Sequence, residues 1–343
     1  MTILTSTQMP APGVSDVHRW TKASRIAAWV SIAVVAGLAL VPTFGSAGMV
    51  DRLAALFVYI ILAAMWNALA GYGGLVSVGQ QLFFGLGAYF TVRIAAAGVD
   101  PFVSMLLGAA VVGLLSYPLS FAMLRLKGGE FAIAMWVVSE LAHLLVNLDG
   151  LIQGETGTSL ISLNAYPAGT RRVVVYCVAL AAMVALLVGL FVLLRSRVGS
   201  AIQAIRDSEE AAETLGVNVV ATKRILFMLA AFGTAIAGAV WLGSATSFQP
   251  KTYFSVQWTA YMIFMVLVGG LGRFEGAILG AVIFFAMETA FGALGVWYLI
   301  GLGLAALMFS LFLPRGLWGA VEARLGLSLM PVGYRLNLKT RTE

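Results

Sequence analysis

Three polar side chains that could exchange protons or bind a ligand lie within one apolar stretch, residues 131–148. Glu140, His143 and Asn147 stand at positions i, i+3 and i+7, so a helix would place them on one face. An ionised carboxylate at the centre of a lone membrane span costs about 2.5–3.5 kcal/mol on insertion scales, and it normally faces a bundle interior or a cavity. The pattern predicts either a structural Glu140–His143 network or a role in substrate passage.

A second polar group interrupts the apolar stretch GYGGLVSVGQQLFFGLGAYF, residues 71–90. Irregular backbone survives at membrane depth only where protein or a water-filled cavity surrounds it. The early glycines therefore predict a break near the inner end of a span, with Ser77, Gln80 and Gln81 facing inward beside the translocation path. Simple helix packing is the alternative for these residues. Asn67 is a further pathway candidate, and Glu288 is another that could lie near the outer surface.

The residue types for metal binding or catalysis are sparse. Cys177 is the only cysteine and is expected to be a small core residue, while His143 is the only histidine within a predicted span. A metal site is therefore not expected, and no carboxylate pair at helical spacing within a span favours an intramembrane enzyme. The chain also lacks the G-x-x-x-x-G-K-[ST] phosphate loop. We expect a protein without its own ATPase site or cofactor.

The elements that carry these residues are predicted to be membrane-spanning helices. Of the 343 residues, 61% are hydrophobic and 10% are charged, and the mean hydropathy is +0.96. This composition is typical of an all-α polytopic membrane protein. About ten apolar stretches are long enough to span a bilayer, with at least one possibly broken: 26–44, 53–70, 74–97, 102–126, 131–148, 172–194, 225–246, 257–272, 275–292 and 294–313.

The positive charges predict how these spans are oriented. An N-terminus in the cytoplasm assigns 16 of the 21 lysines and arginines to the inner side, and leaves only Arg52, Arg93, Arg171, Arg172 and Lys251 outside. Cytoplasmic loops carry such an excess, and the basic residues flank spans that contact lipid, which argues against nucleic-acid binding.

The same orientation predicts the domain organisation. Residues 1–25 form a cytoplasmic N-terminal tail, 26–313 a transmembrane domain, and 314–343 a cytoplasmic C-terminal tail. Two loops are long: 149–171 outside and 195–224 inside.

The inner loop reads SRVGSAIQAIRDSEEAAETLGVNVVATKR at residues 196–224. Its apolar residues recur at helical spacing, Asp207 or Ser208 could cap a second short helix, and Gly216 could end that helix in a left-handed conformation. A helix this short needs a docking surface. That surface is either a cytoplasmic partner or the protein's own rim, because the acidic residues of the loop would be repelled by anionic lipid.

Residues 210–216, EAAETLG, match the EAA-x-x-x-G coupling motif of ABC importer permeases. The chain resembles the branched-chain amino acid ABC transporter permease family over most of its length. The segments that carry this resemblance are SRVGSAIQAIRDSEEAAETLGVN, GLVSVGQQLFFGLGAYF, LRLKGGEFAI, GGLGRFEGAILGA and LPRGLWG. Many members have a histidine where Gln80 stands. The resemblance implies a bacterial inner-membrane subunit for branched-chain amino acids, or for urea, amides or small carboxylates. The implied ATPase-coupling residues are Arg206, Glu209, Glu210, Ala211, Ala212 and Gly216.

The resemblance also implies several partners. These are a sister permease, two cytoplasmic ATPase subunits that carry ATP and magnesium, and a periplasmic or extracellular substrate-binding protein.

Gly272, Gly276 and Gly280 stand four residues apart, a spacing that predicts close helix packing. A gradient-driven secondary transporter or channel is the alternative function, with Glu140 and His143 as an ion relay, but it leaves the EAA-like segment unexplained.

Overall fold

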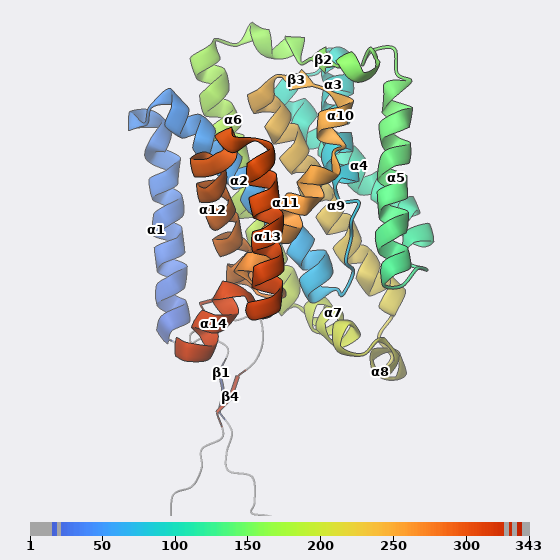
Figure 1. The fold of residues 1–343 in the computed structure, drawn as a ribbon, viewed down its shortest axis with the longest axis vertical. Helices are drawn as coiled ribbons and strands as arrows, with labels where there is room; N and C mark the ends of the chain where they lie inside the picture. The colour runs from blue at the N-terminus through green and yellow to red at the C-terminus, as the bar shows by residue number, and fades with distance from the viewer. Residues whose placement is uncertain (1–15, 19–21, 326–328, 331–334, 338–343) are drawn as a thin grey trace, which may run out of the picture.

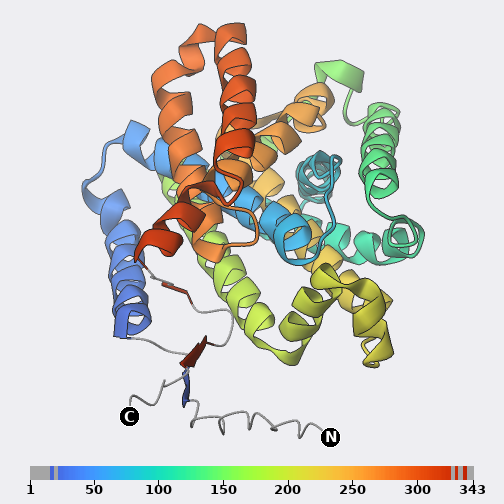
Figure 2. The ribbon, with the colours of Figure 1, turned by 60° about the horizontal axis from the view of Figure 1, so that its bottom comes forward.

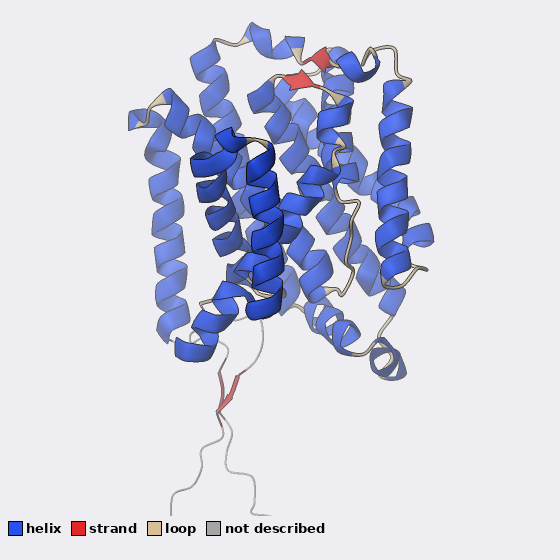
Figure 3. Cartoon of the chain, in the orientation of Figure 1, coloured by secondary structure: helices blue, strands red, loops and turns tan. Residues whose placement is uncertain are grey.

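The computed structural model describes residues 16–18, 22–325, 329–330 and 335–337, and this part of the chain is predominantly α-helical (Figures 1 and 3). The predicted N- and C-terminal tails therefore lie partly outside the described residues. The long helices are α1 (Lys22–Phe44), α2 (Ala47–Asn67), α3 (Gln81–Ala96), α4 (Pro101–Met123), α5 (Gly129–Asn147), α6 (Ala168–Arg195), α9 (Val219–Ala245), α11 (Val256–Gly269), α12 (Phe274–Phe291) and α13 (Val296–Phe312).

Short elements gather at the two ends of the helix bundle (Figure 1). One end, called here the α7–α8 end, carries α7 (Arg197–Asp207), α8 (Glu209–Thr214) and α14 (Gly316–Leu325). The opposite end, called the α10 end, carries η2 (Gly154–Thr156), β2 (Thr158–Ser159), η3 (Ile161–Ala165), β3 (Ser247–Phe248), α10 (Pro250–Tyr253) and η4 (Gly292–Leu294).

The only strand pairs in the described residues are short and antiparallel. Thr158 pairs with Phe248 and Ser159 with Ser247 between β2 and β3, which joins the long loop before α6 to the end of α9. The other pair joins β1 (Asp16–His18) to β4 (Arg335–Asn337), segments near the two ends of the chain.

Within the described residues, nine helical stretches are long and apolar enough to cross a membrane, and α3 is a shorter apolar helix. The sequence predicts a tenth span over 74–97, but its first part is not helical. Helix α2 continues as the π-helical turn η1 (Ala68–Tyr72), and non-helical backbone follows from 73 to 80 before α3 begins at Gln81. The predicted break is therefore present, and it shortens this span.

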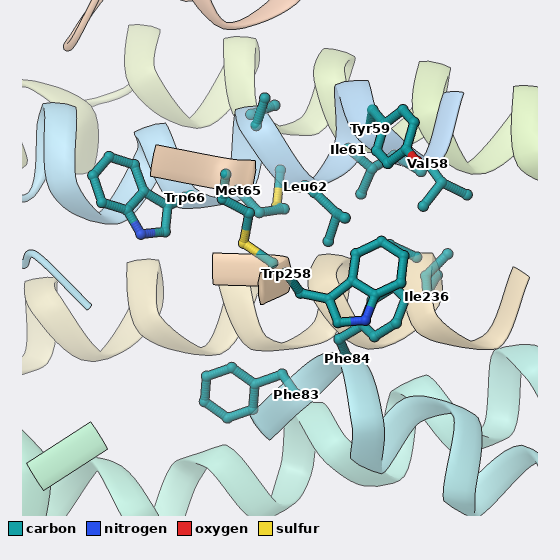
Figure 4. Packing of buried hydrophobic residues seen from close by; sticks show 14 of the residues in the cluster. Val58, Tyr59, Ile61, Leu62, Met65, Trp66, Phe83, Phe84, Ile236 and Trp258 are labelled. Carbon is teal, nitrogen blue, oxygen red and sulfur yellow. The ribbon is translucent and has the colours of Figure 1, made fainter. Parts of the chain in front are cut away.

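The core is centred on α2 and α9, the most deeply buried of the long helices. Figure 4 shows Leu62 and Met65 of α2 facing the α9 side, with Phe83 and Phe84 of α3 approaching from the other side of α9. Helices α1 and α13 lie at the periphery with many exposed apolar side chains, as expected of helices that face lipid. Cys177 is exposed on α6, so its prediction as a core residue is wrong.

Candidate functional site

Helices α7 and α8 form a compact pair at the α7–α8 end, visible in the lower part of Figure 2. Ile202 and Ile205 of the predicted apolar stripe are buried, because α7 packs against α6 and α9. Ser208, rather than Asp207, caps α8 by accepting a hydrogen bond from the main-chain N–H of Ala211 at 3.3 Å. One face of the pair is thus fixed to the protein's own bundle.

The C-terminus of α8 is closed by the hydrogen bonds of a Schellman motif. The main-chain N–H of Val217 donates to the Ala212 carbonyl at 3.1 Å, and that of Gly216 donates to the Glu213 carbonyl at 2.9 Å. Gly216 has a φ of +84° and nothing within 4 Å of where a Cβ would stand. A side chain here would be strained by the left-handed backbone and not by crowding.

The two adjacent alanines of this segment have different surroundings in the structure. Ala212 is 2% exposed and packs in a small cluster with Ile205 and Val219, so it faces the protein itself and is not free to contact a partner. Ala211 is exposed, as are Glu210 and Glu213.

Leu215, a large apolar residue at the tip of this charged segment, is 82% exposed. In contrast to these exposed residues, Glu209 forms an ion pair with Lys223 of α9 at 2.8 Å. The exposed face of α8 is therefore acidic with one apolar tip.

Arg206 connects α7 to the broken helix. Its Nη1 donates a hydrogen bond to the Gly71 carbonyl at 3.0 Å, while its Nε and Nη2 contact the carboxylate of Asp207. The Gly71 carbonyl belongs to the π-turn that ends α2, where unpaired carbonyls attract cationic donors. A displacement of α7 would therefore pull directly on the end of α2.

Gly71 lies at a convergence of three backbone segments. A Cβ at this position would overlap the side-chain oxygen of Asn67 and the main-chain nitrogen of Gly272, and would stand 2.7 Å from the Cα of Gly272. Gly272 belongs to the turn between α11 and α12, and Gly316 at the start of α14 packs against the same turn at Gly270. We call Gly71, Gly270, Gly272 and Gly316 the glycine junction.

Asn67 holds this junction through its side-chain amide. Its oxygen accepts from the Gly272 main-chain N–H at 2.8 Å, and its Nδ2 donates to the Arg273 carbonyl at 3.0 Å. The structure thus places this pathway candidate at the α7–α8 end, with both ends of its amide bonded to backbone. Arg273 also forms an ion pair with Glu322 of α14, which ties α14 to the same turn.

The four-residue glycine pattern follows the contact between α11 and α12. A Cβ on Gly276 would stand 2.7 Å from the Gly270 carbonyl oxygen, and one on Gly280 would overlap the Met265 carbonyl. The two backbones therefore approach too closely for side chains at these positions. Gly272 differs, because it lies in the turn with a φ of +72°.

The non-helical segment 73–80 keeps most of its polar groups paired inside the bundle. The Leu75 N–H donates to the Leu69 carbonyl at 2.9 Å, and the Trp66 indole donates to the Ser77 carbonyl at 2.9 Å. The buried Ser77 hydroxyl accepts from the Gly79 N–H at 3.3 Å. Helix α5 covers this segment, since a Cβ on Gly79 would overlap the Met135 carbonyl.

Gln80 and Gln81 lie fully buried at the start of α3. Gln80 donates from Nε2 to the Thr234 hydroxyl of α9 at 3.0 Å, and its side-chain oxygen has no hydrogen-bond partner among the described residues. Gln81 accepts a hydrogen bond from the Thr259 hydroxyl of α11. The pair thus joins α3 to two other helices, and one buried acceptor remains available.

Glu140, His143 and Asn147 share one face of α5, as predicted, and that face meets the loop at the α10 end. The His143 ring lies 3.1 Å from Glu140 Oε1 through Nδ1 and 2.8 Å from Glu155 Oε1 through Nε2. Asn147 donates to the same Glu155 oxygen at 2.5 Å. Both ring contacts are hydrogen bonds only when each ring nitrogen carries a proton.

Glu155 of η2 is the centre of this cluster. Its second oxygen accepts from the main-chain N–H of Lys251 at 3.0 Å, so it joins α5 to α10. Burial alone raises the pKa of Glu155, but hydrogen bonds from Asn147 and Lys251 and the neighbouring His143 outweigh it, and the net pKa lies below its usual value. The cluster is a link between loop and helices at the α10 end.

Some residues of these clusters are missed by sequence reasoning. Glu155 is one of only two acids in the predicted outer loop, which is the one signal that could have singled it out. Thr234 and Thr259 are ordinary threonines within apolar helices, and only the packing of α9 and α11 against α3 brings them to the two glutamines.

Within the described residues, membrane-length apolar helices, one broken span and a polar helix pair at one end together define a multi-pass membrane protein. The family described as branched-chain amino acid transport system / permease component matches residues 48–314, and the chain belongs to this family. It is 26% identical to the high-affinity branched-chain amino acid transport system permease protein LivM of Salmonella typhimurium, over 80% of this chain and 71% of the relative.

The names of other relatives specify different transported molecules. The chain is 25% identical to the fructose import permease protein FruG of Bifidobacterium longum, over 80% of this chain and 85% of that protein. It is 37% identical to the L-arabinose transport system permease protein AraH of Escherichia coli, over 27% of this chain and 30% of that protein. Among solved structures, PsaBC from Streptococcus pneumoniae in complex with Fab matches with a TM-score of 0.37 and 13% identity, over 74% of this chain and 95% of that chain.

Proposed function

We propose that this chain is the membrane subunit of an ABC importer for branched-chain or related small amino acids. The observation that carries the proposal is the α7–α8 pair, which is fixed on one face and exposed on the other. Its fixed face is bonded to the end of α2 by Arg206, while Ala211 and Leu215 remain exposed. Such a segment can receive a push from a soluble partner and pass it to the spans.

The path of that push follows from the contacts. ATP-driven closure of a pair of ATPase subunits displaces α8, and Arg206 transmits the displacement to the Gly71 carbonyl. The glycine junction then moves α2, α11, α12 and α14 together, because their backbones are in direct contact there. Alternating access results if the two positions of these helices differ in their affinity for substrate.

The proposal assigns sides and partners. The chain spans a bacterial inner membrane, with the α7–α8 end and both tails on the cytoplasmic side. This orientation is favoured because basic residues flank α6, α9 and α14 at that end. A sister permease completes the membrane part, two ATPases bind ATP and magnesium, and a substrate-binding protein delivers substrate to the α10 end. The family description and the LivM relatives support amino acids as the substrate, with urea, amides or small carboxylates as alternatives.

The test is to block the exposed face of α8 without disturbing its buried face. The variant Ala211→Trp places a large ring where the partner would dock, and Ala97→Trp places the same ring on an exposed alanine at the opposite end of the bundle. The chain is co-expressed with candidate ATPase and sister-permease subunits, and uptake and ATP hydrolysis are measured in proteoliposomes. Ala211→Trp should abolish ATP-driven uptake and association with the ATPase while the chain still inserts, and Ala97→Trp should keep the ATPase bound.

Two outcomes would contradict this proposal. Normal ATP-driven uptake by Ala211→Trp would remove α8 from the coupling path. Uptake that persists without ATP and collapses with the ion gradient would instead identify a secondary transporter.

A further inference from the structure

A cavity of about 400 Å³ lies near the α10 end, where α2, α9, α11 and α12 meet and α10 completes the wall. This is within the range of about 300–1,000 Å³ that small-molecule sites occupy. A hollow of about 530 Å³ between α4, α6 and α9 is lined by apolar residues throughout, which suits a lipid tail. The cavity near α10 differs because charged, hydroxyl and amide side chains line it together with aromatic rings.

Four aromatic side chains from three helices line this cavity: Tyr59, Trp241, Trp258 and Tyr261. The ring centroids of Trp241 and Trp258 are 4.9 Å apart, and those of Tyr59 and Trp241 are 6.0 Å apart, so the rings form one continuous wall. The Trp258 indole donates to the Thr252 carbonyl at 2.9 Å, which fixes its orientation. Such a wall can hold an apolar side chain or the face of a cation.

A carboxylate stands beside this wall. Glu288, about one turn before the end of α12, accepts a hydrogen bond from the Tyr59 hydroxyl at 2.9 Å through Oε1. Its other oxygen accepts no hydrogen bond from the part of the chain that the structure describes. A carboxylate next to aromatic rings is a favourable site for an ammonium group.

A cation lines the same cavity from another element. The main-chain N–H of Lys251 is held by Glu155, which positions α10. Its exposed side-chain ammonium makes no hydrogen bond or ion pair within the described ranges, and Lys251 and Glu288 are not paired with each other. Two opposite, separate charges in one cavity match a ligand that itself carries both charges.

We propose that this cavity binds a small zwitterionic amino acid. The ligand's ammonium contacts Glu288, its carboxylate contacts Lys251, and its apolar side chain packs on Trp241 and Trp258. A neutral sugar can hydrogen-bond to Glu288 through its hydroxyl groups, but it offers no opposite charge to either Glu288 or Lys251. The inference rests on the proposed function for the direction of transport, but binding itself needs no ATPase.

The first experiment measures ligand selectivity in the unmodified full-length chain in lipid nanodiscs, without the substrate-binding protein, whose own ligand site would contribute to the titration. Calorimetric titration compares leucine with 4-methylpentanoate, which lacks the ammonium, with 3-methylbutylamine, which lacks the carboxylate, and with fructose. Leucine should bind at least tenfold more tightly than each of the other three. Binding of fructose as tight as that of leucine, equal binding of the analogues, or no leucine binding would overturn the proposal.

The second experiment assigns each charge. Glu288→Gln and Lys251→Gln should each weaken leucine binding at least tenfold. Lys251→Gln should leave the affinity for 3-methylbutylamine unchanged, and Glu288→Gln should leave that for 4-methylpentanoate unchanged. Arg52→Gln, which removes an exposed cation from the first turns of α2 outside the cavity, is the matched control and should bind leucine normally.

The outcome can be separated from that of the proposed function. Ala211→Trp should bind leucine like the unmodified chain. If the chain binds leucine selectively but never associates with an ATPase, only the importer proposal fails. If an ATPase couples normally and neither cavity variant changes leucine binding, only this inference fails.

Discussion

The two ends of the molecule are held together by different kinds of contact. At the α7–α8 end, backbone meets backbone at the glycine junction, where a methyl group added at Gly71 or Gly316 would overlap a neighbouring backbone segment. At the α10 end, Glu155 links α5, η2 and α10 through hydrogen bonds from side chains and one main-chain N–H. The glycine junction transmits displacement rigidly, whereas the Glu155 link can open when a few hydrogen bonds are lost. The backbone pairing of β2 with β3 also holds the α10 end together.

The largest effect is expected at Gly71. In Gly71→Ala the added methyl group must displace the Gly272 backbone, and such overpacking typically costs about 1–3 kcal/mol. The melting temperature in detergent should fall clearly, and ATP-driven uptake should be lost. Gly37→Ala on α1, where nothing lies within 4 Å of the new Cβ, is the control and should melt like the unmodified chain. Equal melting of the two variants would show that the junction is not rigid.

Substitutions of Gly216 test the effect of backbone strain in the absence of steric crowding. In Gly216→Ala the left-handed backbone costs about 1 kcal/mol, although the space around it is open. We expect the end of α8 to fray, which hydrogen exchange of residues 212–217 would detect, and coupling to weaken with little change in melting temperature. Gly216→Asn should be milder, since asparagine tolerates this conformation better. If the amides of residues 212–217 exchange no faster in Gly216→Ala than in the unmodified chain, the Schellman motif does not depend on glycine at this position.

Arg206 tests the link between α8 and the broken span. Removing its hydrogen bond to the Gly71 carbonyl in Arg206→Gln should cost about 1 kcal/mol or less of stability, because the side chain is partly exposed. The transported amount per ATP hydrolysed should nevertheless fall severalfold. Arg206→Lys retains a cationic donor and should recover part of this ratio. An unchanged ratio in the glutamine variant would mean that force passes through another contact.

The smallest effect is expected at Glu155, and it depends on pH. Because the pKa of this carboxyl is lowered in the folded protein, its stabilising contribution is complete above the ordinary pKa and is lost as the pH falls through the lowered pKa. The protection factors of the amides at residues 249–253, which correct for the intrinsic effect of pH on exchange, should therefore fall on acidification below about pH 4.5. Glu155→Gln should exchange faster already at neutral pH and lose much of this acid response. An unchanged acid response in that variant would assign the effect to another group.

The α7–α8 end could be predicted largely from sequence, and the α10 end could not. Glycine spacing, caps and the EAA-like motif are local signals, so the break after α2 and the end of α8 at Gly216 follow from neighbouring residues. The location of Asn67 at the glycine junction depends on contacts with Gly272 and Arg273, more than 200 positions away. The Glu155 cluster and the cavity with Lys251 and Glu288 likewise join distant segments.

Ala212 shows how two adjacent residues of one motif can differ. The family resemblance assigns Ala211 and Ala212 alike to ATPase coupling. In the structure Ala212 fills a cluster with Ile205 and Val219, whereas Ala211 is exposed. Ala212 must be small to fit this cluster, and only Ala211 faces outward. The helical period separates them once Ser208 fixes where α8 begins.

Photo-crosslinking can test directly whether the exposed tip of α8 contacts an ATPase subunit, as we propose. A photoreactive amino acid replaces Leu215 in one sample and Ala97, at the opposite end, in another, within the assembled complex. We expect a product containing the ATPase from position 215, with a yield that changes on adding ATP, and no such product from position 97. An assembled complex that gives no ATPase product from position 215 would contradict this proposal.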